Sequence, residues 1–126
     1  MNVKTDTKEK FSVITPVEPE ISANMTEELN AVLLSFLQNP IRNVVLNLSD
    51  IQNIEDAAAE TLVLIQQRFY EENASFVACN LSEPLSEKLE NTGLLEILNA
   101  VPTESEAYDI VQMEEIEREF MEDENP

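Results

Sequence analysis

Three carboxylates stand close together near the middle of this 126-residue chain, at Glu55, Asp56 and Glu60. They fall where a strand leads into a helix, which is the edge at which α/β proteins bind ligands. Two carboxylates could act there as general acid and general base, so a hydrolase is one hypothesis. The structural interpretation is stronger, because acids in a first helical turn complement the helix dipole and cap free N–H groups. No His, Lys or second polar group in the neighbouring sequence completes a catalytic set.

The composition excludes many other chemistries. The chain has no His, one Cys and one Gly. It therefore lacks a Ser-His-Asp triad, a His-ligated or thiolate metal site, a dinucleotide fingerprint and a P-loop. Cys79 lies in an apolar run with no cationic neighbour, which favours a buried, inert thiol over a nucleophile. We expect neither a cofactor nor a metal.

The net charge excludes several kinds of partner. It is −19, from 26 acidic and 7 basic residues. Such a surface repels nucleic acid and anionic lipid, and seven scattered bases form no basic patch. The longest purely apolar run has four residues, so no membrane insertion is expected. With a lone Cys and no signal peptide, we expect a cytoplasmic location.

Hydrophobic periodicity predicts alternating strands and helices around the carboxylates. Strands are expected at 10–15, 44–48, 75–79 and 94–101, with helices after each of them. The helix at 56–72 has its inner face at Leu62, Ile65 and Phe69. This order predicts an α/β fold with a small mixed, mostly parallel sheet of four to five strands and about four packed helices. Residues 10–121 are expected to form a single domain, between a flexible N-terminus (1–9) and an acidic flexible C-terminus (122–126).

An acidic helix is expected to close the chain, from Thr103 to about Met121. Its predicted inner stripe consists of Ala107, Ile110, Met113, Ile116 and Phe120. Ten acids and one base lie between residues 104 and 124. Such a run is ordinarily a solvated face, and the alternative is a docking face for a basic partner. We favour the solvated face for Glu114, Glu115, Glu117 and Glu119.

Four segments, in order, resemble a known family. The first runs from 44 to 65 and combines Val-Val-Leu-Asn-Leu-Ser-Asp-Ile at 44–51, Ile54 and Leu-Val-Leu-Ile at 62–65. The other three are Asn-Leu-Ser at 80–82, which follows a strand, Leu-Glu-Asn-Thr-Gly-Leu at 89–94, and Thr-Glu-Ser-Glu-Ala at 103–107. Together they resemble the STAS family of bacterial anti-sigma factor antagonists, whose domains also occur in sulfate transporters and stressosomes. The resemblance spans about residues 10–121 and implies a STAS, or SpoIIAA-like, fold.

The resemblance places this chain's main departure at the family's phosphorylation motif. Family members carry Asp-Ser-Ser-Gly or Asp-Ser-Thr-Gly at the strand-to-helix loop, whereas residues 55–58 read Glu-Asp-Ala-Ala. The phosphoacceptor position is Ala57, which has no hydroxyl, and the nearest hydroxyl is that of Thr61. We therefore expect the usual Ser/Thr switch to be absent. The neighbouring acids could mimic the phosphorylated, released state, and Ala57 could equally mimic the unphosphorylated, partner-bound state.

The resemblance implies a non-enzymatic interaction domain that regulates transcription by binding an anti-sigma factor or a related ATPase-kinase. The expected contact surface surrounds Ala57 and comprises Asn53, Ile54, Glu55, Asp56, Ala58, Ala59, Glu60, Thr61 and Leu62, with the three Ala forming a flat face. One alternative is a STAS subunit of a larger assembly, such as a stressosome-like particle or a lipid-transport ABC complex. A lower alternative is the carboxylate hydrolase, which requires a concave pocket at 54–60. A homodimer is a further alternative.

Overall fold

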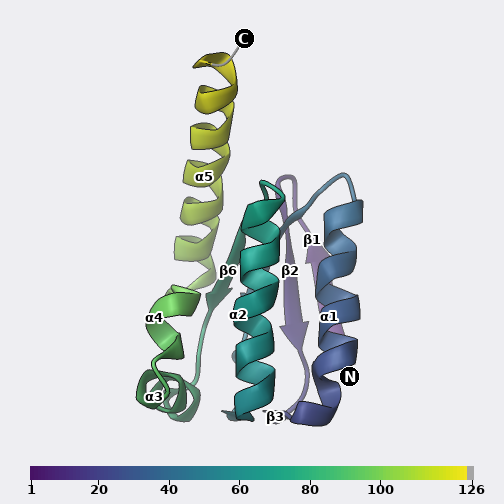
Figure 1. Cartoon of the computed structure of the whole chain (residues 1–126), viewed down its shortest axis with the longest axis vertical. Helices are drawn as coiled ribbons and strands as arrows, with labels where there is room; N and C mark the ends of the chain where they lie inside the picture. Colours follow the sequence, from purple (N-terminus) through teal and green to yellow (C-terminus); the bar gives the residue numbers. More distant parts are fainter. Residues whose placement is uncertain (125–126) are drawn as a thin grey trace.

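The fold is built around a four-stranded sheet (Figure 1). The computed structural model describes residues 1–124, with side chains described through Met121. The sheet order is β1 (Val3–Thr7), β2 (Phe11–Pro16), β4 (Asn43–Asn47) and β6 (Phe76–Cys79). β2, β4 and β6 are parallel, and β1 is antiparallel to β2 at the edge. The short strands β3 (Glu20–Ile21) and β5 (Asn53–Ile54) form a separate parallel pair.

Five α-helices accompany the strands in the described part of the chain. They are α1 (Thr26–Leu34), α2 (Asp56–Glu71), α3 (Glu83–Asn91), α4 (Leu94–Leu98) and α5 (Glu104–Glu124), with 3-10 turns η1 (Ala23–Met25) and η2 (Ser35–Gln38). Figure 1 shows α1 and α2 side by side in front of the sheet. This mixed, mostly parallel α/β architecture confirms the predicted fold class.

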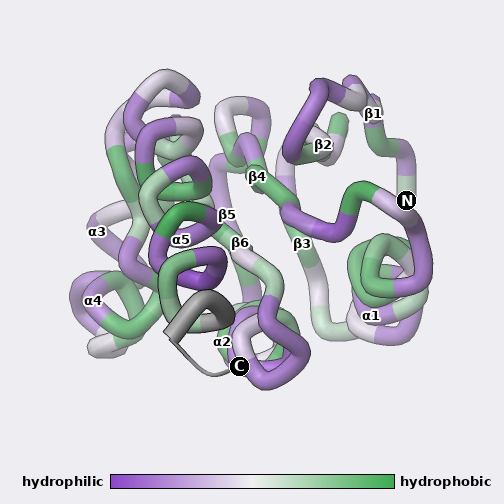
Figure 2. The backbone as a smooth tube through the Cα atoms, turned by 90° about the horizontal axis from the view of Figure 1, so that it is seen from above, coloured by the Kyte–Doolittle hydropathy of each residue, from purple (hydrophilic) through white to green (hydrophobic). Residues whose placement is uncertain are grey.

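Both faces of the central strands are buried. Val44, Leu46 and Phe76 belong to the larger core with α1 and α2, while Val45 and Val77 belong to a smaller core with α5. Successive side chains of a strand point to opposite faces, so a short continuous apolar run fills both layers. Seen from above, the strongly hydrophobic β4 lies near the centre of the molecule (Figure 2).

Helix α2 faces this core through the residues that its periodicity predicts. Leu62, Ile65 and Phe69 are each exposed by 1% or less. They recur at three- and four-residue spacing, which keeps one stripe of the helix against the sheet. This packing fixes the orientation of the whole helix, including its first turn, where the candidate site lies.

Two predictions about strands are wrong. Residues 1–9 are not a flexible start, because Val3–Thr7 forms β1 and pairs with β2 from Pro16 back to Ser12. A polar edge strand is held by backbone hydrogen bonds rather than by an apolar face, so hydrophobic periodicity does not reveal it. Residues 94–101 do not form a strand either. Gly93, at φ +77°, separates α3 from α4, and only Val101 makes an isolated bridge, to Cys79.

Helix α5 also differs from its prediction. It continues to Glu124, so residues 122–124 are helical rather than a flexible tail, and residues 125–126 lie outside the described part. Ala107 and Val111 are buried, but Met113, Ile116 and Phe120 are 54%, 64% and 61% exposed. A period of 3.6 residues extends the buried stripe from 107 and 111 to 114, 115 and 118 instead. The distal half of the predicted inner stripe therefore faces solvent.

Candidate interaction surface at the start of helix α2

The loop that carries the predicted site lies between β5 and α2. Pairing with β3 holds it, because Asn53 and Ile54 are in register with Glu20 and Ile21. The backbone N–H of Glu55 then donates to the carbonyl oxygen of Ile21 at 2.9 Å. The loop is thus fixed on one side by a strand pair and on the other by the packed helix α2.

The acidic side chains of the loop contact neighbouring segments rather than the end of their own helix. Glu55 occupies the position before α2 but makes no side-chain cap there, and its Oε1 accepts from the backbone N–H of Ala23 at 2.9 Å. The Asp56 carboxylate lies 3.8 Å from Lys88 Nζ of α3. The predicted capping role is therefore replaced by tertiary contacts to η1 and α3, although Asp56 still lies in the first turn, where its charge complements the dipole.

Only part of the predicted surface is accessible. Glu55, Asp56, Ala57 and Glu60 are exposed, and Asn53 and Thr61 are half-buried. Ile54, Ala58, Ala59 and Leu62 are buried and cannot contact a partner in this conformation. The prediction of a flat face of three Ala is wrong, because Ala58 and Ala59 share the inner stripe of α2 with Leu62. A single exposed methyl group, that of Ala57, remains among the acids.

This surface holds no evident catalytic arrangement. The three carboxylates are exposed, and the contacts of Glu55 and Asp56 tie them to a backbone amide and to a lysine. The Thr61 hydroxyl donates to the carbonyl oxygen of Ala57 at 2.9 Å. The arrangement therefore supports surface contact with another molecule better than it supports acid–base chemistry, which needs paired groups converging on a substrate.

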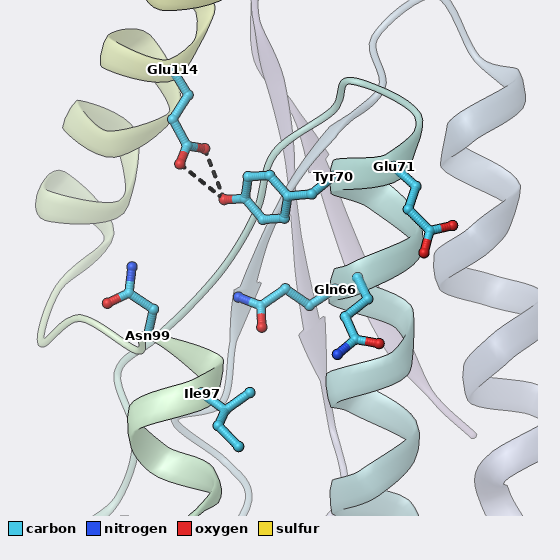
Figure 3. Close-up of a pocket in the computed structure, with 7 residues that line it drawn as sticks. Gln66, Tyr70, Glu71, Ile97, Asn99 and Glu114 are labelled. Atoms are coloured by element: carbon cyan, nitrogen blue, oxygen red, sulfur yellow. Dashed lines mark hydrogen bonds between the residues drawn. The ribbon is translucent and has the colours of Figure 1, made fainter.

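The hollow between α2, α4 and α5 (Figure 3) is lined by the later turns of α2 rather than by this loop. It has a volume of about 610 Å³ and is lined by Gln66, Gln67, Tyr70, Glu71, Ile97, Asn99 and Glu114. The Tyr70 hydroxyl donates to both Glu114 oxygens, at 2.8 and 3.1 Å, and burial together with this carboxylate raises the pKa of Tyr70. The buried Gln66 amide donates to the carbonyl oxygen of Leu98 at 2.8 Å. These polar groups thus have structural partners.

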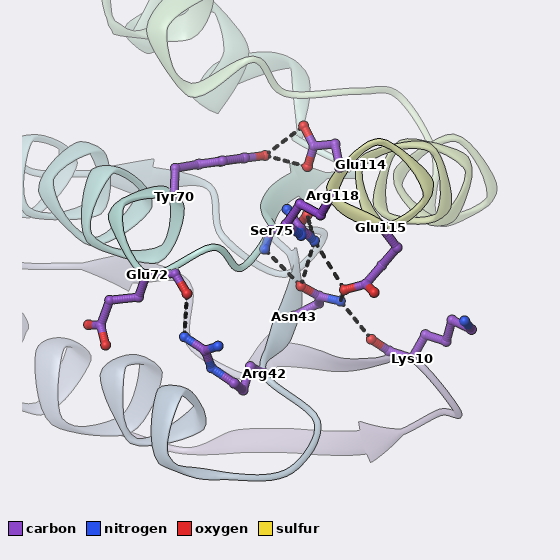
Figure 4. A network of polar contacts seen from close by, with 9 residues as sticks. All are labelled: Lys10, Arg42, Asn43, Tyr70, Glu72, Ser75, Glu114, Glu115 and Arg118. Carbon is purple, nitrogen blue, oxygen red and sulfur yellow. Dashed lines mark hydrogen bonds and ion pairs between the residues drawn. The ribbon is translucent and has the colours of Figure 1, made fainter. Parts of the chain in front are cut away.

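A second polar cluster fastens α5 to the sheet (Figure 4). The Asn43 amide donates to Glu115 Oε1 at 2.8 Å, and Arg118 donates to the same oxygen at 3.1 Å and to Ser75 Oγ at 3.0 Å. The hydrogen bond from Asn43 and the nearby Arg118 guanidinium lower the pKa of Glu115. The predicted solvated face is wrong for Glu114 and Glu115, which are half-buried and paired, whereas Glu117 and Glu119 are exposed.

Cys79, the one cysteine of the chain, is part of the core. Cys79 is fully buried, as predicted, and burial raises the pKa of its thiol to about 12. Among the described side chains, no three His, Cys, Asp or Glu residues lie close enough together to hold a metal ion. No helix in residues 1–124 combines the length and the apolar character that crossing a membrane requires.

The described fold, a mixed sheet with α1 and α2 on one face and α5 on the other, is that of a small α/β domain. A family model for the STAS domain matches residues 2–107, so the chain belongs to the STAS domain family. This confirms the family that the sequence motifs indicate. Among curated proteins, the sequence comparison finds no match.

Solved structures show where the same fold occurs. An anti-sigma-factor antagonist (STAS) domain protein from Planctomyces limnophilus is 21% identical, with 87% of this chain and 97% of that chain covered and a TM-score of 0.74. The anti-sigma factor antagonist SpoIIAA, in its unphosphorylated form, is 15% identical, with 88% and 96% covered and a TM-score of 0.70. The murine anion transporter Slc26a9 is 10% identical, with 86% and 18% covered and a TM-score of 0.71. At these identities the likeness is one of fold.

Proposed function

We propose that this STAS domain is a non-enzymatic, cytoplasmic regulator that binds an anti-sigma factor or a related ATPase-kinase through the start of α2. The observation that carries the proposal is the exposed Ala57 at the first turn of a helix that packs on the core through its buried side. The accessible contact surface comprises Asn53, Glu55, Asp56, Ala57, Glu60 and Thr61. The likeness to anti-sigma factor antagonists supports this class of partner.

We further propose that the surface is permanently in its partner-binding state. The Glu55 carboxylate accepts from the backbone N–H of Ala23, and that of Asp56 lies 3.8 Å from Lys88 Nζ, so two of the three acids are engaged within the chain. Ala57 itself adds only a methyl group where a phosphate would add about −1.5 to −2 charges. These contacts support resemblance to the unphosphorylated state over mimicry of the phosphorylated one.

A capture experiment with matched variants tests the surface. Tagged wild-type protein, Ala57→Arg and Ala31→Arg are used to capture partners from cells of the source organism, and ATPase-type regulators are identified by mass spectrometry. Ala31 is an exposed alanine on α1, away from the loop, so it controls for the added charge. We expect Ala57→Arg to lose the partner and Ala31→Arg to retain it. Equal capture by all three proteins would contradict the proposed surface.

A second candidate function is that of a STAS subunit in a larger assembly. The likeness in fold to one part of the Slc26a9 transporter favours it. The matched region is 18% of the Slc26a9 chain, so this fold does occur as one part of a membrane transporter. Co-purification separates the two candidates: a stoichiometric complex with stressosome-like or transporter subunits would favour the assembly. A homodimer remains an alternative that sedimentation of the purified chain addresses.

A further inference from the structure

Helix α5 presents a second, unpartnered apolar stripe. We propose that Met113, Ile116 and Phe120 form the seam of a docking surface for a basic amphipathic helix of a protein partner. The three side chains are 54%, 64% and 61% exposed. The buried face of the same helix, with Ala107, Val111 and the anchored Arg118, packs against β4 and β6 on another side. The outer stripe is therefore not needed for the domain's own packing.

The spacing of the stripe fits a helical partner. Residues 113, 116 and 120 are separated by three and then four positions, which is the a-d-a pattern of a two-stranded coiled coil. They span about 10 Å of helix, or two turns. Figure 1 shows that the C-terminal end of α5 extends beyond the rest of the molecule, whereas Glu114, Glu115 and Arg118 still contact other elements. The seam residues are exposed on another side of the helix from these contacts, so a partner helix could lie along them.

The charges beside the seam determine which helix fits. With Met113 at a, Glu117 occupies e and Glu119 occupies g, and both side chains are exposed. Positions e and g set partner choice in coiled coils. Asp109 precedes the seam at the preceding d position and is also exposed. A partner with Lys or Arg at its own e and g positions would be attracted to Glu117 and Glu119.

The same charges disfavour a second copy of this chain. In either orientation, a pair of α5 helices would set Glu opposite Glu at the e and g positions, where like charges repel. Each chain also carries a net charge of −19. The one base of α5, Arg118, is at the f position, where it pairs with Glu115 and donates to Ser75. It is therefore held on the side away from the seam.

This surface is independent of the one proposed at the start of α2. β3 and the start of α2 lie at one end of the molecule, and the exposed end of α5 lies at the other (Figure 1). A partner on either surface would leave the other free. The two proposals therefore fail separately: loss of one interaction says nothing about the other.

A designed peptide tests the seam. It has about 14 residues, four helical turns, with Leu at a and d and Lys at e and g, and its binding to the full chain is measured by fluorescence anisotropy. Ile116→Ser and Phe120→Ser each remove one apolar side chain of the seam. The control is Leu64→Ser, because Leu64 lies on α2 and, at 64% exposed, is as accessible as Ile116. We expect about a tenfold weaker affinity for each seam variant, and no change for Leu64→Ser or Ala57→Arg.

Three results would overturn the proposal. The first is equal binding of a scrambled peptide of the same composition, which would reduce the effect to net charge. The second is sedimentation of the free chain as a dimer that Phe120→Ser dissociates, because the occupant would then be a second copy. The third is binding to neutral phosphatidylcholine vesicles that the seam variants abolish. Circular dichroism of the variants verifies that α5 is still folded.

Discussion

The Thr61 hydroxyl donates to the carbonyl oxygen of Ala57 at 2.9 Å, so the nearest hydroxyl to the degenerate phosphoacceptor position is turned back onto its own helix. We expect no phosphate on residues 55–58 or on Thr61 after incubation with an anti-sigma-type kinase and ATP. Mass spectrometry of the treated protein measures this. Stoichiometric phosphate on Thr61 would mean that the switch has moved rather than disappeared.

Removing the Tyr70 hydroxyl should loosen α5 from α2. Tyr70 donates to both oxygens of Glu114, and Tyr70→Phe leaves this half-buried carboxylate without that donor. We expect a loss of about 1 kcal/mol in the free energy of unfolding, measured by urea titration. Tyr108→Phe is the control, because its hydroxyl accepts only from Gln112 within α5. Equal losses in both variants would show that the link between the helices contributes nothing of its own.

Glu115→Gln should destabilise the protein in a pH-dependent way. The pKa of Glu115 is lowered in the fold by Asn43 and Arg118, so its stabilisation is present above the unfolded pKa of about 4 and is lost as pH falls through the lower folded value. We expect a loss of about 1 kcal/mol at pH 7 that becomes smaller as the pH is lowered below about 4, by urea titration. The exposed Glu117→Gln serves as control and should cause no loss. A pH-independent difference would rule out the ionised contact as the cause.

The thiol of Cys79 should not react in the folded protein. It is fully buried, and its pKa is raised to about 12, so it stays protonated at pH 8. Because the fold favours the neutral thiol, Cys79 stabilises the folded state below the unfolded pKa of about 8.5, and this stabilisation is lost as pH rises towards the folded value. We expect a thiol-reactive dye at pH 8 to label Cys79 only in urea. Rapid stoichiometric labelling without denaturant would contradict the inert assignment.

The central elements were predictable because their signals are local. The apolar run at 44–48 corresponds to β4, and the spacing of Leu62, Ile65 and Phe69 corresponds to the inner face of α2. The position of Ala57 at the first turn of that helix follows from the same pattern. Such signals depend on the side chains of one segment, so they can be read without knowing what the segment meets.

The sequence by itself thus determined the α/β class, the family and the missing hydroxyl at Ala57. Only the tertiary structure decided that Val3–Thr7 is a strand, since its partners are backbone groups of β2. It also decided that Ala58 and Ala59 face inward and that Ile116 and Phe120 face outward. A helical stripe tells which residues share a side, but whether the sheet or the solvent lies on that side depends on where the helix is anchored. In α5 the anchors are the buried Ala107 and Val111 and the hydrogen bond from Arg118 to Ser75 of a distant segment.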